Sequence, residues 1–142
     1  SIHITSGTYE ESVDVIVPVE IIGENKETTV IDAQRRDYAM KLLADNSRVQ
    51  GLTFTNANTG LHVLSDNTTV EDCIAAGNIG RRGEDGYWTF DGNHYTATSA
   101  TPGGIGAGIR IDGNNNEVLE NIILNTVGGQ GGQGQGRRKK RP

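Results

Sequence analysis

One short phrase recurs three times and limits what this chain can fold into. Its copies are ADNSRVQGLTFTNA, SDNTTVEDCIAAGN and GNNNEVLENIILN, at 44–57, 65–78 and 113–125. Alignment places Val49, Val70 and Val118 in one column, at intervals of 21 and 48 residues, the second being two units of about 24. Self-similarity at 20 to 30 residues is typical of solenoids, in which each unit buries its apolar face against its neighbours.

The other aligned columns assign a place to each kind of residue. Asn46, Asn67 and Asn115 share the same intervals, and Asn favours turns because it tolerates left-handed backbone angles and its amide can bond the amide above. The remaining columns are Leu52, Cys73 and Asn121, then Phe54, Ala75 and Ile123. We therefore expect asparagines at the turns and an inner aliphatic file that contains the three valines.

Short β-branched stretches bounded by Asn, Asp, Gly and Ser predict short strands between tight turns. Strands of this kind at about 20 residues per round predict an all-β fold, a single-stranded right-handed parallel β-helix of about five to six rounds. The alternative is an antiparallel all-β domain whose Asn-rich loops resemble each other by chance.

The predicted β-helix domain covers 1–127 and has one long interruption. At 79–108 the repeat lapses into a polar, Gly-rich excursion with four of the aromatic residues. Loops of this length are functional or disordered, and the aromatic residues argue against disorder. The Gly/Gln-rich and then basic segment 128–142 cannot bury a core, so we expect a flexible tail.

Composition and charge limit the classes of partner that this chain is expected to bind. Five of the 13 basic residues lie within 137–142, which leaves 8 basic against 18 acidic residues in the body, a net charge of −10. An acidic body disfavours nucleic acid, and divalent cations or a neutral polymer suit it better. No apolar run is long enough to span a membrane, and the lone Cys73 is expected to be a small core residue. No signal peptide is recognisable, although the chain opens at Ser1 without Met.

The phrases GTYEESV, VEIIGE and TVIDA resemble the first rounds of right-handed β-helix proteins of the pectin-lyase-like superfamily. The three aligned phrases are similar to repeats of the NosD-like and carbohydrate-binding-and-hydrolysing β-helix families. This resemblance covers about 2–125. It implies the fold, a polysaccharide partner, and an extracellular or cell-surface location, with the periplasm as an alternative. If the protein is an enzyme, the resemblance implies a polysaccharide lyase or a glycoside hydrolase.

Carboxylates give the candidate catalytic and metal residues. In β-helix lyases acidic groups hold calcium and a basic residue abstracts a proton, whereas hydrolases use carboxylate pairs. Arg110, Asp112 and Asp91 are the candidate catalytic residues, and Asp85 is the candidate ligand of calcium. Strand alternation places Arg110 and Asp112 on the solvent face, opposite Ile109 and Ile111. The alternative is a solvated ion pair, and the stretches typical of pectin methylesterases and pectate lyases are missing.

Aromatic side chains in the excursion give the candidate substrate-binding residues, which are Tyr87, Trp88, Tyr95 and His94. Aromatic rings stack on the C–H faces of sugars, and we expect the excursion to fold over the face of Arg110 and Asp112. The alternative is that these rings only attach the loop to the scaffold.

Three functions remain open on these grounds. The first is a surface module that binds or processes polysaccharide. The second is a structural segment of a larger surface or fibre protein that self-associates through the ends of the helix, without catalysis. The third is NosD-type metal handling, for which the three histidines are too scattered to make a strong site.

Overall fold

The computed structural model describes residues 1–90 and 92–133, and of Trp88 it describes the backbone. All regular structure in this part of the chain is β. The first sheet contains β1 (Ile2–Ile4), β4 (Glu20–Gly23), β7 (Arg48–Gln50), β10 (Thr69–Glu71) and β15 (Glu117–Leu119). The second contains β2 (Gly7–Glu10), β5 (Thr29–Asp32), β8 (Thr53–Thr55), β11 (Ile74–Ala76) and β16 (Ile122–Leu124). The third contains β3 (Val13–Val15), β6 (Tyr38–Leu42), β9 (Thr59–Val63) and β14 (Ala107–Ile111).

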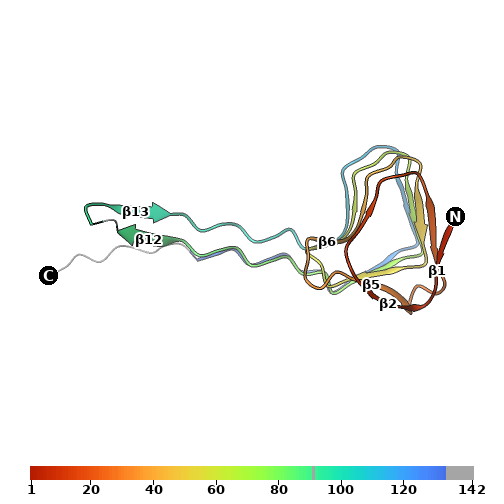
Figure 1. The fold of residues 1–142 in the computed structure, drawn as a ribbon, viewed down its shortest axis with the longest axis horizontal. Coiled ribbons are helices and arrows are strands. Elements are labelled where there is room, and N and C mark those ends of the chain that lie inside the picture. The colour runs from red at the N-terminus through yellow and green to blue at the C-terminus, as the bar shows by residue number, and fades with distance from the viewer. Residues whose placement is uncertain (91, 134–142) are drawn as a thin grey trace.

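The chain visits the three sheets in turn and then returns to the first (Figure 1). Every strand pair within these sheets is parallel. The alternative of an antiparallel domain with chance loop similarity is therefore wrong. Stacked parallel sheets of short strands are compatible with the predicted parallel β-helix.

The predicted valine file is confirmed. Val49 pairs with Val70, and Val70 with Val118, at the same register in the first sheet. Val49 and Val70 are buried, while Val118 is 40% exposed because β15 is the last strand of its sheet. A second file in the neighbouring sheet joins Phe54, Ala75 and Ile123, as the alignment predicted. The core is thin because each strand contributes one or two inward side chains, which suits the low apolar share of the sequence.

The first aligned column of asparagines has left-handed backbone angles, which explains why asparagine recurs there. Asn46, Asn67 and Asn115 have φ of 62°, 54° and 56°. Asn adopts this region more readily than most residues, so the predicted turn role is confirmed. The link between neighbouring copies is made by backbone, since Asn46 N–H donates to Asp66 O and Asn67 N–H to Asn114 O.

A different set of asparagines makes the side-chain bridges between successive repeats. Asn78 Nδ2 donates to Phe54 O, and Asn78 Oδ1 accepts from Ala57 N–H, both at 3.1 Å. Asn116 and Asn121 do the same to the repeat below, each binding a carbonyl and the N–H three residues later. Each bridge satisfies two backbone groups that a turn would otherwise leave without partners.

The excursion forms a long arm that projects to one side of the stacked sheets (Figure 1). At its far end lies the hairpin, which consists of antiparallel β12 (Tyr87–Phe90) and β13 (Tyr95–Thr98). The expectation that the excursion folds over Arg110 and Asp112 is wrong, because the hairpin is held away from that face.

Three glycine-rich segments, 80–86, 101–106 and 127–133, run side by side along the arm (Figure 1). N–H groups of the first donate to the third at Gly80, Gly83 and Gly86, and N–H groups of the third donate to the second at Gly129 and Gly132. Bonds at every third residue have the period of a polyproline II helix. As at the axis of collagen, there is no room for a side chain: a Cβ on Gly132 would lie 1.8 Å from Glu84 O.

The arm therefore contains the first part of the predicted tail. Residues 128–133 are hydrogen-bonded to both passes of the excursion. The rest of that segment, 134–142, lies outside the described residues.

Candidate functional site

The predicted pair Arg110 and Asp112 meets a third ionisable side chain on the outer face of the third sheet. Arg110 pairs with His62 across β14 and β9, which places both side chains on one face. Asp112 Oδ2 lies 2.9 Å from Arg110 Nε and 2.6 Å from His62 Nε2. Ile109 on the opposite face packs against the core, as predicted, while Ile111 is 39% exposed because β14 is the last strand of its sheet.

The electrostatics of this cluster favour a charged carboxylate. The hydrogen bond from His62 is the largest effect and lowers the pKa of Asp112 below its usual value; desolvation opposes it, and the charge of Arg110 lowers the pKa further. A carboxyl with a lowered pKa is a poor general acid near neutral pH, because almost none of it carries a proton. The cluster suits an ion-paired surface more than an acid–base pair.

The other candidate catalytic and metal residues are not brought to this cluster. Asp85 lies on the arm, where it accepts from Arg82 at 2.8 Å and from Gln133 N–H at 2.7 Å, and the bond from Gln133 most lowers its pKa. Asp91 lies outside the described residues. In the described part of the chain, no three His, Cys, Asp or Glu side chains are placed to hold a metal ion. Cys73 is buried as predicted, and burial raises the pKa of its thiol to about 11.

The hairpin holds the predicted substrate-binding residues in an exposed position. Tyr87 in β12 and Tyr95 in β13 are 52% and 40% exposed. Trp88 is opposite Ala97 in the backbone pairing, and its side chain lies outside the described part. His94 lies in the connection between the two strands and is exposed.

Phe90 belongs to this surface and was missed among the candidate residues. It is opposite Tyr95 in the hairpin, and their rings stack with centroids 4.7 Å apart. Phe90 is 57% exposed, so the stacked pair presents an open aromatic plate. The available signal was the pattern of two short aromatic-containing strands around the turn residues DGN, which is typical of a hairpin.

Comparison with protein-family models, with curated proteins and with solved structures gives no match for this chain. In the described residues, no helix has the length and apolar character to cross a membrane.

Proposed function

We propose that this chain is a right-handed, single-stranded parallel β-helix of about five to six rounds, of the pectin-lyase-like type, and that it works as an extracellular or surface module that binds polysaccharide. The binding surface is the aromatic hairpin at the end of the arm. The observation that carries this proposal is the exposed, stacked pair of Phe90 and Tyr95.

Aromatic exposure supports binding at the hairpin. A two-stranded hairpin alone buries little apolar surface, and large exposed aromatic rings are typical of interaction sites. Flat rings match the C–H faces of sugars, and tyrosine adds a hydroxyl at the edge of the ring that can bond sugar hydroxyls. The arm places these rings away from the scaffold, where a long polymer can reach them without a cleft.

Binding is favoured over processing by the separation of the candidate groups. Arg110 and Asp112 lie on the third sheet, Asp85 lies on the arm, and the aromatic residues lie at its end. Acid–base cleavage of a glycosidic bond needs two carboxyl groups within about 10 Å on either side of the sugar. The candidate carboxylates Asp85 and Asp112 lie in different parts of the molecule, which supports a ligand-binding surface more than catalysis by this pair.

Replacing Phe90 with alanine is expected to weaken polysaccharide binding about tenfold, because one member of the aromatic plate is lost and ring contacts contribute about 1 kcal/mol beyond burial. The affinity can be measured by isothermal titration calorimetry against the best ligand found on a glycan array. Phe90→Tyr keeps the ring and should retain binding within about threefold.

The control for this experiment is the fold of the hairpin itself. Amide exchange across the Tyr87–Thr98 pair reports whether the strands stay paired in each variant. If Phe90→Ala preserves that pairing and binds every glycan as well as the parent, the hairpin is not the binding surface.

The second candidate function is structural, and the two ends of the stack favour it. The last strands expose a group of large apolar side chains: Val118, Leu119, Ile122, Ile123 and Leu124. At the other end, an apolar cavity of about 250 Å³ opens between the three sheets, lined mainly by Ile2, Ile4, Tyr9, Val13, Ile21, Ile31 and Met40. Unpaired strand edges with apolar neighbours invite end-to-end stacking.

If stacking is the function, the mass measured by light scattering will rise with protein concentration, and Ile123→Lys will abolish the rise by placing a charge on the exposed end. Gln50→Lys, which adds the same charge at an outer position of β7 in the middle of the first sheet, is the matched control. A mass that stays monomeric at millimolar concentration contradicts self-association.

A further inference from the structure

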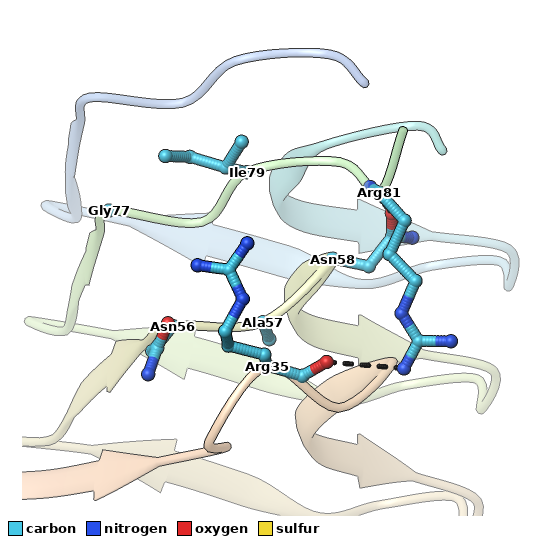
Figure 2. Close-up of a pocket in the computed structure, with 7 residues that line it drawn as sticks. All are labelled: Arg35, Asn56, Ala57, Asn58, Gly77, Ile79 and Arg81. Carbon is cyan, nitrogen blue, oxygen red and sulfur yellow. Dashed lines mark hydrogen bonds between the residues drawn. The ribbon is translucent and has the colours of Figure 1, made fainter. Parts of the chain in front are cut away.

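A cavity at the base of the arm holds an arginine that the proposed function does not use. The cavity is about 260 Å³ and lies where the second sheet turns toward the third; we call it the arginine pocket (Figure 2). Its lining residues are Arg35, Asn56, Ala57, Asn58, Gly77, Ile79 and Arg81. In Figure 2 the side chain of Arg35 extends into the space below Ile79, while the Arg81 guanidinium turns to the Arg35 carbonyl oxygen.

Arg35 differs from every other lysine and arginine in the described part of the chain. The others have a carboxylate, an amide oxygen or an aromatic ring as partner. The Arg35 guanidinium has no such partner among the described residues, in a body whose net charge is −10. A guanidinium presents five N–H donors in a rigid fork, so an unpaired one beside a cavity is a ready donor set.

The backbone that carries Arg35 is held in an unfavourable conformation. Gln34 and Arg35 have φ of 51° and 66°, two consecutive non-glycine residues in the left-handed region. Each such residue costs on the order of 1 kcal/mol, and conformations of this kind cluster at functional sites. Two bonds fix the strained segment: Arg35 N–H donates to Asn56 O at 2.7 Å, and Gln34 N–H to Asp32 Oδ1 at 2.8 Å.

The other polar side chains that line the pocket are turned to partners of their own. Asn58 Oδ1 accepts from Arg81 N–H at 3.1 Å, and in Figure 2 the Asn58 side chain points toward Arg81, away from the Arg35 guanidinium. Of the neighbouring charged groups, Arg81 forms an ion pair with Asp37 at 3.1 Å, and Asp32 accepts a hydrogen bond from the neutral amide of Asn56 at 3.1 Å.

We propose that the arginine pocket binds an oxyanion group, with the Arg35 guanidinium as its charged donor. The chemistry is shared by carboxylate, phosphate and sulfate, all of which accept the two parallel N–H bonds of a guanidinium fork. This site is separate from the hairpin and does not depend on polysaccharide binding there.

The test is a titration followed by NMR of the arginine side-chain N–H groups in the full chain. Inorganic phosphate is the free-anion probe, and an oligosaccharide of uronic acids is the probe that carries carboxylates on a polymer. The Arg35 Nε–H signal is expected to shift with a dissociation constant on the order of millimolar for phosphate, as suits a single charged donor. Arg35→Gln should weaken binding about tenfold, since the charged fork is lost.

The matched control is Arg36→Gln, because Arg36 is the exposed neighbour that does not line the cavity. It removes the same charge and should leave the affinity unchanged. A shift with phosphate assigns the site to small anions, and a shift with the oligosaccharide alone assigns it to a polymer-borne carboxylate; both support the proposal. No Arg35 shift with either probe, or equal binding by Arg35→Gln and the parent, overturns it.

Discussion

Replacing Asn78 with alanine lowers the free energy of unfolding by about 3 kcal/mol, because it leaves two buried backbone groups without partners. The Asn78 side chain is fully buried, and it is the partner of Phe54 O and Ala57 N–H in the repeat below. Each unsatisfied buried group costs about 1–3 kcal/mol. The loss can be measured by urea denaturation followed by circular dichroism.

Asn114→Ala is the matched control, since Asn114 is exposed and its side chain makes no bridge in the described residues. Its free energy of unfolding should change by less than about 0.5 kcal/mol. Repacking cannot easily rescue Asn78→Ala. Gly60 lies directly against the Asn78 amide, since a Cβ on Gly60 would be 2.6 Å from Asn78 Nδ2, and glycine has no side chain to fill the space that the amide leaves. Equal stability of the two variants would show that the asparagine bridges do not stabilise the stack.

Replacing Gly132 with alanine separates the third segment of the arm from the other two. The added Cβ would lie 1.8 Å from Glu84 O and 2.9 Å from Asp85 N, both backbone atoms that cannot move aside cheaply. We expect the bond from Gly132 N–H to Thr101 O to break, together with the bonds that Gly83 and Gly86 N–H donate to the same segment. Loss of these bonds should lower the free energy of local opening by about 1.4 kcal/mol or more. Hydrogen exchange at the amides of residues 83 and 86 should therefore accelerate tenfold or more.

The neighbouring glycine supplies the control for that experiment. A Cβ on Gly131 would meet its nearest atom, Gly103 N, at 4.0 Å, so Gly131→Ala fits without a clash. Its exchange rates at 83 and 86 should stay within about threefold of the parent, with a small gain from the less flexible unfolded chain. Fast exchange at both amides in the unmodified protein would mean that the three segments do not associate in solution.

The closing asparagines of the repeated phrase show how far alignment reaches. Asn56 and Asn125 have left-handed backbone angles of 62° and 51°, so they act as turn residues. Asn78 closes the second copy of the phrase but points inward and bridges two repeats. In the second copy the turn place seven residues after the valine is held by Gly77, with φ of 68°, and Asn78 comes one residue later. Asparagine therefore has two roles near the end of the phrase, and the contacts with the repeat below distinguish them.

The sequence predicted individual residues of the candidate site better than it predicted their arrangement in space. Strand alternation placed Arg110 and Asp112 together on the outer face, but the contact with His62 joins residues 50 positions apart. Such a contact depends on the register between β9 and β14, which the long excursion between them conceals in the sequence. The arginine pocket was not predictable for the same reason. Arg35 lies in a turn of one repeat, and other residues that line the pocket belong to later repeats.

The repeating parts of this protein follow from its sequence alone. Strands, turns and the valine file follow from a local pattern, since each repeat packs mainly on its neighbours and the same residues recur at the same register. The ordered conformation of the arm, in contrast, depends on tertiary contacts. Glycine at every third position in 80–86 is also the composition of a flexible linker, and it becomes an ordered segment only where two other segments supply hydrogen-bond partners. Those partners are far apart in the chain, and no side-chain pattern in the sequence predicts them.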